Sequence, residues 1–385
     1  MSVHIASVAS TEYGKHGDAS SRELLRDVAI EIFDATAIAP QDIDAVYVGN
    51  FMGDLIEDQG HMGALVADYI GAHEVQSVRV ESACASGGAA VHQAVNAIES
   101  GAVDVAFVCG VEMMSIAAID RLTDALANAA DDIYENEQGL TFPGIYALMA
   151  RRYMHEFDVT HEELAAVSVK NRGNALANPI AQLGEDITVD DVLESPSIAS
   201  PLTLYDVCPV TDGASGVVLV SDTFAAAHDL TTSIPILGIG QSGDALALQE
   251  RASITGIPSA ARAADAAFEH AGVGPDDIDV VEVHDCFTIA EVLALESIGF
   301  YETGEGVRGA LNDETTVDGE FPVNTSGGLL GKGHPVGVTG VGQLVELTKQ
   351  LEGRHPNQVS DPTTALAHNV GGSGASTTVT ILGSE

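Results

Sequence analysis

The spacing of apolar residues predicts helices that are each followed by a short strand. Behind Ser20 the apolar residues recur at helical spacing, and Glu23 is placed to complete a capping box with Ser20. Residues 39–50 open with a proline and continue as a short β-branched run that ends at a glycine. A helix that leads into a strand is the repeating unit of an α/β protein.

This unit occurs twice in the chain. Residues 258–273 form a second helical pattern, and the strand-like run behind it contains Pro275-x-Asp-Ile-Asp, which matches Pro40-x-Asp-Ile-Asp. The glycine-rich segment that begins at Cys84 matches the one that begins at Val338, and each continues as an amphipathic helix. Two such pairs of matching segments predict an internal duplication.

The duplication and a change of pattern between the repeats divide the chain into three parts. Strand signals fade in residues 121–200, where we expect a helical insertion that covers the substrate. The apolar run at 214–222, within residues 201–225, predicts a strand that returns to the first sheet. We therefore expect a first half of residues 1–120 plus about 201–225, and a second half of residues 226–385.

Charge and hydropathy add expectations about the surroundings of the protein. The 385 residues contain no run of about 18 apolar residues and no signal-peptide pattern, so we expect a cytoplasmic protein without membrane contact. The formal net charge is −42, from 57 acidic and 15 basic side chains. The repulsion between so many negative charges is screened only in about 1 M salt, where the Debye length is about 3 Å. The same negative charge repels nucleic acid. We expect a halophilic source and no nucleic-acid partner.

The four cysteines Cys84, Cys109, Cys208 and Cys286 lie far apart and lack the spacing of a zinc site, so we expect neither a disulfide framework nor a bound metal. Cys84 follows residues 75–82, which predict a buried strand, and begins a glycine-containing helix pattern. A helix N-terminus there would lower the pKa of the thiol from about 8.5 to between about 3.5 and 7.5. A lone cysteine is more often a packed apolar residue, but this setting favours a nucleophile.

A nucleophilic thiolate needs a base and groups that stabilise an oxyanion. The second half offers His334 in the glycine-rich loop GGLLGKGHPVG, and His284 and Cys286 just beyond the C-terminal end of a strand, where open α/β sheets place their sites. Residues 367–374 end a strand in glycines whose N–H groups can face an oxyanion. The alternatives are a surface histidine, a core cysteine and a simple glycine turn.

Two nucleotide-binding patterns are weak. Residues 238–243 match G-x-G-x-x-G behind a strand-like run, but no glycine-supported helix start follows them. The segment GLLGKGHP is not a P-loop, because no Ser or Thr follows Lys332.

Seven segments together resemble the thiolase family: ESACASGG, GVEMMS, VSVKNRGNALANP, VTDGASGVVLV, VHDCFT, GGLLGKGHPVG and HNVGGSG occur in the order and spacing seen in thiolases. The resemblance covers nearly the whole chain, and the HDCF form is similar to the archaeal and sterol-carrier-protein-type thiolases. It implies a five-layered αβαβα fold with two duplicated halves and a helical loop domain. It also implies an acetyl-CoA C-acetyltransferase that condenses two acetyl-CoA molecules to acetoacetyl-CoA and coenzyme A.

The resemblance further implies a role for each catalytic side chain. Cys84 is acylated, His334 activates it and helps to hold the substrate thioester oxygen, and His284 takes the place of an oxyanion-hole asparagine. Cys286 removes the α-proton of the second acyl-CoA. Bacterial thiolases carry a second cysteine before the final glycines, where this chain has His368, so His368 is the alternative acid/base.

Two binding roles complete the expected site. The N–H groups of Cys84 and of Gly371 or Gly372 are expected to form a second oxyanion hole. The phosphates of coenzyme A require local positive charge in so acidic a protein, and the basic residues of the insertion are the candidates: Arg151, Arg152, Lys170 and Arg172. The alternative for these cations is pairing with acidic neighbours on helices.

By resemblance we expect no cofactor beyond the coenzyme A thioester substrates, and a homodimer or tetramer. A product that feeds the mevalonate pathway and partners such as a zinc-binding OB-fold protein and hydroxymethylglutaryl-CoA synthase are further expectations. The alternatives are a 3-ketoacyl-CoA thiolase of fatty-acid breakdown or polyhydroxyalkanoate synthesis and a non-catalytic scaffold or lipid-binding subunit. Ketoacyl synthases lack the HDCF motif, and the related aldolases lack the nucleophilic cysteine.

Overall fold

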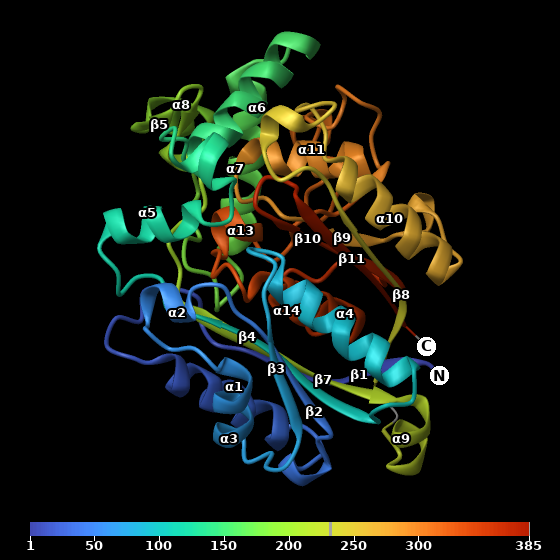
Figure 1. Ribbon diagram of the computed structural model, residues 1–385. Helices are drawn as coiled ribbons and strands as arrows, with labels where there is room; N and C mark the ends of the chain where they lie inside the picture. Colours follow the sequence, from blue (N-terminus) through green and yellow to red (C-terminus); the bar gives the residue numbers. More distant parts are fainter. Residues whose placement is uncertain (231–232, 385) are drawn as a thin grey trace.

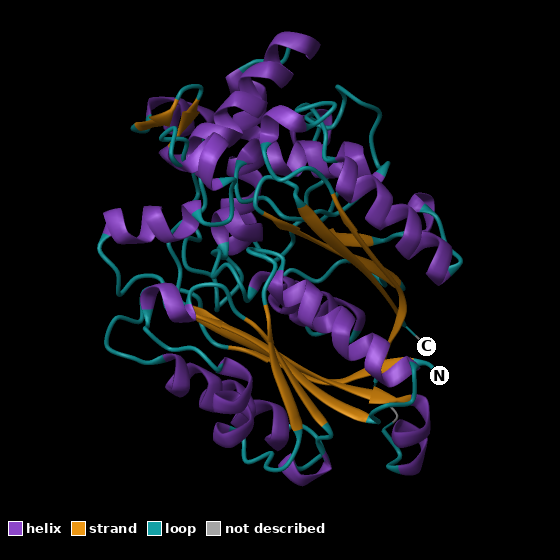
Figure 2. Cartoon of the chain, in the orientation of Figure 1, coloured by secondary structure: helices purple, strands orange, loops and turns teal. Residues whose placement is uncertain are grey.

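Residues 1–230 and 233–384 are described by the computed structural model, in which two half-sheets face each other across central helices (Figures 1 and 2). The strands of the first half are β1 (Val3–Ser10), β2 (Ala45–Gly49), β3 (Gln76–Val80), β4 (Val105–Glu112) and β7 (Gly213–Ser221). Those of the second half are β8 (Ile234–Gly243), β9 (Val280–Glu282), β10 (Thr364–Gly371) and β11 (Ser376–Gly383). Their order is β3-β2-β4-β7-β1-β8-β11-β10-β9, so the half-sheets meet where β1 pairs with β8.

The two halves repeat one pattern of strand pairing. In the first, β2 is parallel to β3 and β4, and β7 is antiparallel to β4 and β1. In the second, β9 is parallel to β10, and β11 is antiparallel to β10 and β8. Matching 3₁₀ turns, Pro40–Asp42 and Pro275–Asp277, precede β2 and β9. The internal duplication predicted from the sequence is confirmed.

The helices complete five layers in the order αβαβα. Helices α4 (Ser86–Glu99) and α14 (Thr339–Leu351) lie between the half-sheets (Figure 1). The outer face of the first half-sheet is covered by α1 (Ser21–Asp34) and α3 (Met62–Tyr69), and that of the second by α10 (Pro258–Ala271) and α11 (Thr288–Ile298). The predicted fold class is confirmed.

The segment between β4 and β7 is mainly helical. It contains α5 (Ile119–Ala127), a π-helical turn (Asp132–Asn136), α6 (Phe142–Phe157), α7 (His161–Ala175) and α8 (Val189–Glu194), then a short hairpin of β5 (Ser197–Ala199) and β6 (Leu202–Thr203). Shorter helices elsewhere are α2 (Gly53–Ile56), α9 (Asp222–Ala227), α12 (Arg308–Leu311) and α13 (Gly328–Gly331), with further 3₁₀ turns at Leu204–Asp206 and Leu248–Glu250. Helix α7 packs on α11, α12 and α13, which ties the insertion to the second half.

Local signals in the sequence are confirmed in several places. Ser20 caps α1 and forms the capping box with Glu23. The run at 214–222 is β7, which joins the first half-sheet as expected. The G-x-G-x-x-G match lies inside β8, where Gly238 and Gly240 allow close contact with the backbone of α10 and form no phosphate loop.

One strand prediction is wrong in its burial. Residues 75–82 contain β3, but this strand is half-exposed because it lies at the edge of the sheet. Val78 is 46% exposed. An apolar run has the same sequence pattern in a central strand and in an edge strand, so the pattern does not reveal the position.

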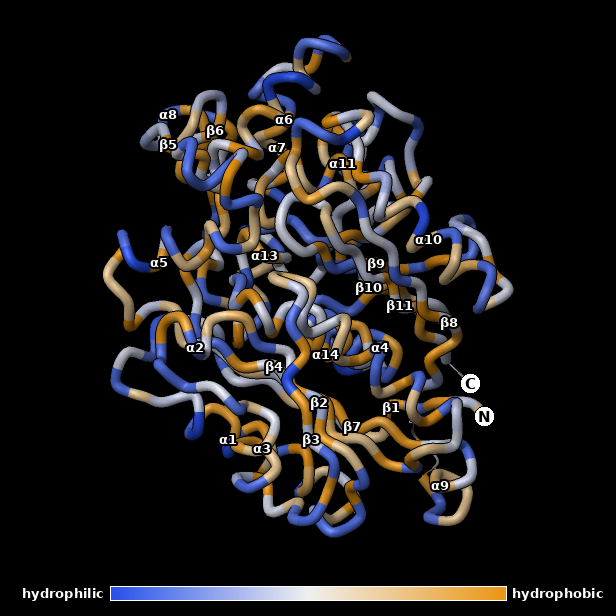
Figure 3. The backbone as a smooth tube through the Cα atoms, viewed as in Figure 1, coloured by the Kyte–Doolittle hydropathy of each residue, from blue (hydrophilic) through white to orange (hydrophobic). Residues whose placement is uncertain are grey.

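Hydrophobic residues follow the layers. Figure 3 shows them along β1, β7 and the helices between the half-sheets, while hydrophilic residues gather in outer loops. The central cluster joins α4 and α14 to both half-sheets. Among the residues described, no helix is long and apolar enough to cross a bilayer.

Candidate active site

Four loops converge where strands of both half-sheets end. Cys84 lies between β3 and α4, His284 and Cys286 follow β9, His334 lies between α13 and α14, and Gly372 follows β10. Ends of parallel strands on one edge of a sheet are the common location of sites in α/β proteins. The structure thus brings together segments that are up to about 290 residues apart in sequence, as their shared cavity shows.

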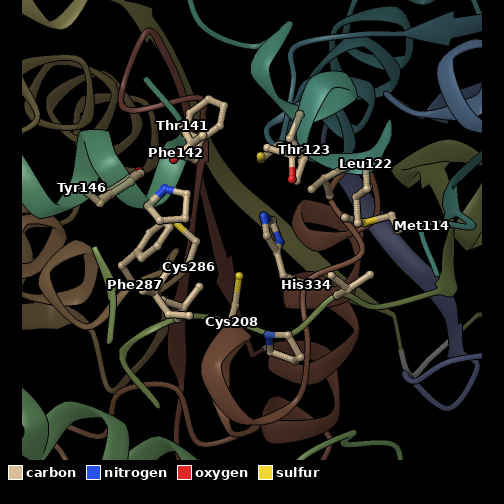
Figure 4. Close-up of a pocket in the computed structure, with 18 of the residues that line it drawn as sticks. Met114, Leu122, Thr123, Thr141, Phe142, Tyr146, Cys208, Cys286, Phe287 and His334 are labelled. Carbon is tan, nitrogen blue, oxygen red and sulfur yellow. The ribbon is translucent and has the colours of Figure 1, made fainter. Parts of the chain in front are cut away.

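These loops surround an apolar cavity of about 490 Å³. Figure 4 shows His334 inside it, with Tyr146, Cys286 and Phe287 on one side and Met114, Leu122 and Thr123 on the other. The lining residues all lie in the described part of the chain, and none is Lys, Arg, Asp or Glu. Helix α6 of the insertion supplies side chains to one of these sides and helix α5 to the other, so the inserted segment shapes the space next to Cys84.

The helix behind Cys84 starts later than predicted. Helix α4 begins at Ser86 with Ala85 at its N-cap, so Cys84 precedes the helix instead of lying in its first turn. The residue before it, Ala83, adopts φ 49°, a left-handed conformation that is costly for a side chain with a Cβ. This turn directs the Cys84 side chain into the cavity, where the backbone N–H of Gly372 faces the sulfur.

The thiol of Cys84 is also protonated in the resting site, contrary to the predicted thiolate. Burial among apolar side chains raises the pKa of Cys84 to about 12, and this outweighs the stabilising backbone N–H groups of Gly372 and Cys84. Acylation of this sulfur therefore requires a base that removes its proton.

His334 is placed to be that base. A ring nitrogen of His334, a ring nitrogen of His284 and the Cys84 sulfur all lie within 4.8 Å of one another. The His334 Nδ1 lies 2.7 Å from the hydroxyl oxygen of Thr339, which in turn donates to the Pro335 carbonyl oxygen at 3.3 Å. Since that hydroxyl has one proton, His334 Nδ1–H donates to it and Nε2 keeps its lone pair. Burial lowers the pKa of His334 to about 3, so the ring is neutral.

His284 lies edge-on to His334, with ring centroids 4.9 Å apart and planes at 86°. It is 1% exposed, and burial, with His334 and His368 nearby, lowers the pKa of His284 well below its ordinary value. Its Nδ1 lies 3.1 Å from the Asn369 amide nitrogen. Its Nε2 has no hydrogen-bond partner among the described residues, so one polar atom remains for a ligand.

Cys286 is the second thiol at the cavity. It is 5% exposed, and burial raises the pKa of Cys286 well above its ordinary value. The Tyr146 hydroxyl is within hydrogen-bonding reach of its sulfur, and the Tyr146 ring stacks on Phe287 with centroids 4.4 Å apart. The adjacent Asp285 accepts hydrogen bonds from the N–H groups of Leu329 and Leu330, which anchors this loop to the segment before His334.

His368, the alternative acid/base, lies at the end of β10 beside Asn369. Asn369, and not His368, donates a hydrogen bond to the Cys84 carbonyl oxygen, at 3.0 Å. His368 is fully buried, accepts from the His284 N–H at 3.4 Å and does not line the cavity. Neighbouring residues of a strand point to opposite faces, so a shift of one residue decides which side chain contacts the nucleophile.

The structure does not support a phosphate-binding role for Lys170 or Arg172. Lys170 is buried and pairs with Glu291 at 2.8 Å, and Arg172 is buried and pairs with Glu185 at 3.0 Å. Lys170 neutralises a buried carboxylate, whereas the carboxylate that pairs with Arg172 is part-exposed. Both cations are themselves buried and have little surface to offer a phosphate.

The other two cations of the insertion are exposed. Arg152 forms a surface ion pair with Glu156 at 2.9 Å. Arg151 donates to the carbonyl and hydroxyl oxygens of Ser200, two residues from Ile198 at the mouth of the cavity. Neither arginine lines the cavity itself.

Several residues of the site have no distinctive signal in the sequence. Cys208, Tyr146 and Thr339 contact the cavity or its histidines, but each lies in a segment predicted only as a helix or a loop. Cys208 lies beside Cys286, whose carbonyl oxygen accepts its N–H at 3.1 Å. The fourth cysteine, Cys109, is buried in the core of the first half-sheet, as expected for an apolar residue.

Known proteins match this chain along its full length. Residues 3–223 match the family model described as the N-terminal domain of thiolase, and residues 240–384 match the one described as thiolase C-terminal domain-like. A protein of Methanothermobacter thermautotrophicus named acetyl-CoA acetyltransferase is 41% identical over 381 residues, which are 99% of this chain and 99% of that protein.

Human sterol carrier protein 2 is 29% identical over 97% of this chain and 70% of its own length. The solved structure of an Ltp2-ChsH2(DUF35) aldolase superposes with a TM-score of 0.86 at 27% identity, covering 100% of this chain and 98% of that one. The expected similarity to archaeal and sterol-carrier-type proteins is confirmed.

Proposed function

The chain belongs to the thiolase family, and we propose that it is an acetyl-CoA C-acetyltransferase, which condenses two acetyl-CoA molecules to acetoacetyl-CoA and coenzyme A. One observation supports this proposal most directly. The Cys84 sulfur lies within 4.8 Å of ring nitrogens of His284 and His334, at a cavity that is also lined by Cys286 and Cys208. Two thiols and a neutral base suit a reaction with an acyl-enzyme and a separate α-proton transfer.

In the first half-reaction, His334 Nε2 takes the proton of the Cys84 thiol as the sulfur attacks the thioester carbonyl. A bond forms between Cys84 sulfur and the acetyl carbon, the bond from that carbon to coenzyme A breaks, and the departing thiolate takes up the proton that His334 received from Cys84. The carbonyl oxygen becomes negative in the transition state and requires hydrogen-bond donors. The N–H groups of Cys84 and Gly372, which both face the Cys84 sulfur, are suited to hold it.

In the second half-reaction, the Cys286 thiol first gives its proton to the neutral His334, and the resulting thiolate removes a proton from the α-carbon of another acetyl-CoA. The carbanion attacks the acetyl group on Cys84, the bond from that acetyl carbon to the Cys84 sulfur breaks, and the departing Cys84 thiolate takes up the proton held by His334. Negative charge then develops on the thioester oxygen of the second substrate, where His284 Nε2 is the free donor. Cys286 suits the acid/base role better than His368, because Cys286 lines the cavity and His368 does not.

The cavity also supports a second candidate, a 3-ketoacyl-CoA thiolase of fatty-acid breakdown or polyhydroxyalkanoate synthesis. Its wall contains apolar side chains from α5 and α6, among them Leu122, Leu126 and Phe142. Such a wall suits an acyl chain longer than acetyl as well as the pantetheine arm. The rate with acyl-CoA substrates of increasing length separates the two candidates.

The proposal extends to the surroundings of the enzyme. We propose that the acetoacetyl-CoA feeds the mevalonate pathway, with hydroxymethylglutaryl-CoA synthase and a zinc-binding OB-fold protein as partners, on the resemblance to archaeal thiolases alone. The relative at 41% identity supports the acetyl transfer itself. The exposed edge strand β3 supports a homodimer, because an open edge can pair with that of a second copy. The net charge of −42 supports a cytoplasm of molar salt.

Coenzyme A is proposed to bind with its phosphates outside the cavity, near Arg151. This guanidinium contacts Ser200, two residues after Ile198, which lines the cavity and is 44% exposed. Arg152 on the same helix adds positive charge nearby.

Mass spectrometry of the protein after a brief incubation with acetyl-CoA in molar salt tests the mechanism. We expect an acetyl group on Cys84 in the wild type and in Cys286→Ser, with condensation lost in Cys286→Ser, and no adduct in Cys84→Ser. Cys109→Ala is the matched control, since Cys109 is a core residue outside the cavity. A wild type without an adduct, even with an OB-fold partner supplied, would favour a non-catalytic scaffold.

A further inference from the structure

Asn369 connects the nucleophile, the oxyanion-hole histidine and a central helix. Its Nδ2 lies 3.0 Å from the Cys84 carbonyl oxygen and 3.1 Å from His284 Nδ1. Its Oδ1 accepts from the Gly88 N–H in the first turn of α4, at 3.4 Å. The side chain is 2% exposed, so all these contacts are made away from water.

The direction of this amide is fixed by two backbone groups whose chemistry is unambiguous. A carbonyl oxygen only accepts and a backbone N–H only donates. A reversed amide would place Oδ1 against the Cys84 carbonyl oxygen and Nδ2 against the Gly88 N–H. Both contacts would be repulsive in a buried site, and two hydrogen bonds would be lost. The NH₂ group of Asn369 therefore faces Cys84 and His284.

The position also requires small neighbours. A Cβ on Gly340 would lie 2.5 Å from Asn369 Oδ1, and a Cβ on Gly88 would lie 3.2 Å from it. These glycines lie in the first turns of α14 and α4, the two helices between the half-sheets. The Asn369 amide thus fits between the first turns of α4 and α14 only because both turns carry a glycine at this contact.

The amide determines where His284 carries its proton. Its NH₂ group donates to Nδ1, so Nδ1 must supply a lone pair and the single proton of the neutral ring must lie on Nε2. Nε2 is the atom without a partner among the described residues. The ring stays neutral because its burial, reinforced by His334 and His368, lowers the pKa of His284.

We propose that Asn369 is a positioning residue that fixes His284 as its Nε2–H tautomer, so that this histidine donates to a thioester oxygen while His334, held by Thr339, presents a lone pair. This inference rests on the proposed acyl transfer and assigns its donor and its base. Two histidines whose rings are 4.9 Å apart have different roles because their Nδ1 atoms have different partners.

The same tautomer protects the site against metal ions. Cys84, His284 and His334 offer one sulfur and two nitrogens within 4.8 Å, a donor set suited to Zn²⁺. A ring nitrogen that carries a proton cannot bind a metal, so the Nε2–H of His284 removes one ligand from the set.

The most informative substitution is Asn369→Asp, which preserves shape but offers only acceptors to His284. His284 must then carry its proton on Nδ1, and Nε2 can no longer donate. We expect condensation near pH 7 to fall about 100- to 1,000-fold, the effect of losing one oxyanion donor. Below about pH 6 activity should recover in part, because the carboxylate favours an imidazolium with protons on both nitrogens. Zn²⁺ should inhibit this variant at concentrations at least about tenfold lower than the wild type.

Asn369→Ala is the matched control. It removes the same contact to Cys84 but leaves Nδ1 of His284 without a charged partner, so its activity should not recover on acidification. A role limited to packing predicts the opposite result, in which both variants lose activity with the same pH profile as the wild type and the same sensitivity to Zn²⁺.

The tautomer is also measurable without a substitution at Asn369. In wild-type protein with ¹⁵N-labelled histidine, the His284 signals, assigned by their absence in His284→Asn, should show a protonated Nε2 and an unprotonated Nδ1. A protonated Nδ1 would overturn the inference even if Cys84 becomes acetylated. A wild type with the expected tautomer but without acetylation would refute the proposed function and leave the inference intact.

Discussion

The hydroxyl of Tyr146 donates a hydrogen bond to the Gly372 carbonyl oxygen at 3.1 Å and so joins the inserted helix α6 to the glycine turn beside Cys84. The same hydroxyl is within reach of the Cys286 sulfur. When Cys286 is a thiolate, the Tyr146 O–H can donate to it and stabilise its charge.

We therefore expect Tyr146→Phe to slow condensation about 10- to 100-fold, since a hydrogen bond to a charged group contributes about 1.5–3 kcal/mol. Acetylation of Cys84 should change much less, because it does not require the Cys286 thiolate. Steady-state condensation and single-turnover acetylation measure the two effects. Tyr153→Phe is the control, since Tyr153 lies on the same helix and bonds to Glu296 away from the cavity. An equal loss in both steps would contradict a role through Cys286.

The raised pKa of Cys84 predicts how iodoacetamide reacts with it. With a pKa of about 12, only a small fraction of the thiol is ionised near neutrality. The rate of Cys84 alkylation should rise about tenfold per pH unit between pH 7 and 10, because the thiolate fraction does so below the pKa. Peptide mass spectrometry with Cys84→Ser as the background follows the reaction. A plateau that begins below pH 8 would indicate a preformed thiolate–imidazolium pair.

The low pKa of His334 makes a related prediction for catalysis. His334 is unprotonated above its pKa of about 3 and can act as a base throughout the neutral range. Acetylation of Cys84 should therefore show no loss attributable to His334 between pH 5 and 8. His334→Gln should lower the rate about 100- to 10,000-fold, the usual contribution of a general base. Stopped acetylation reactions analysed by mass spectrometry measure both effects. A rate that rises with an apparent pKa near 6.5 would show that His334 is more exposed to water than the structure indicates.

Glu346 predicts an acid-sensitive fold. Burial alone would raise the pKa of this carboxyl, but Lys332 at 3.7 Å and Lys349 at 3.8 Å outweigh burial and hold the pKa of Glu346 far below its ordinary value. A carboxylate with a depressed folded pKa stabilises the protein above its unfolded pKa, near 4.3. This stability is lost as pH falls through the folded pKa.

Glu346→Gln should lower the free energy of unfolding at pH 7 by about 3–5 kcal/mol, because it leaves buried lysines unpaired. Its stability should also fall less steeply below pH 4 than that of the wild type. Urea unfolding at several pH values in molar salt checks both statements. Glu156→Gln, which breaks a surface pair with Arg152, should cost less than about 1 kcal/mol. Equal losses of unfolding free energy in Glu346→Gln and Glu156→Gln would contradict a special stabilising role of the buried Glu346 carboxylate.

The net charge predicts that salt stabilises the fold. At −42, repulsion between the acidic side chains opposes folding in dilute buffer and is screened as KCl rises from 0.1 to about 2 M. We expect the melting temperature to rise steadily over that range. Sucrose at matched osmolality is the control, because it does not screen charge. A melting temperature that responds equally to both solutes would exclude screening as the cause.

The coenzyme A contacts yield a final pair of variants. Arg151→Ala should raise the KM for acetyl-CoA severalfold with little change in stability, because Arg151 is exposed near the cavity mouth. Lys170→Met should lower stability and leave the KM of the folded enzyme nearly unchanged, because Lys170 pairs with the buried Glu291. A raised KM for acetyl-CoA in Lys170→Met, with an unchanged KM in Arg151→Ala, would indicate that Lys170 binds a phosphate of coenzyme A.

The sequence by itself determined the elements and their order. The capping box at Ser20, the repeated Pro-x-Asp-Ile-Asp turns and the helical pattern of the insertion are local signals, and the structure contains each of them. The segments that contain Cys84, His284, Cys286 and His334 were also recognisable as candidate parts of one site. Loops that follow the C-terminal ends of strands lie at the same edge of a sheet.

Tertiary structure alone decided the state and the partners of these residues. The pKa of Cys84 depends on apolar side chains from distant segments, so a prediction from the nearby helix start had the wrong sign. The contact of Asn369 with Cys84, and the position of His368 away from the cavity lining, depend on the face of β10, which one residue of register reverses. Lys170 became a structural cation because folding buried Glu291 beside it. Periodicity along a chain reports which residues are buried, whereas electrostatics depends on which residues are buried together.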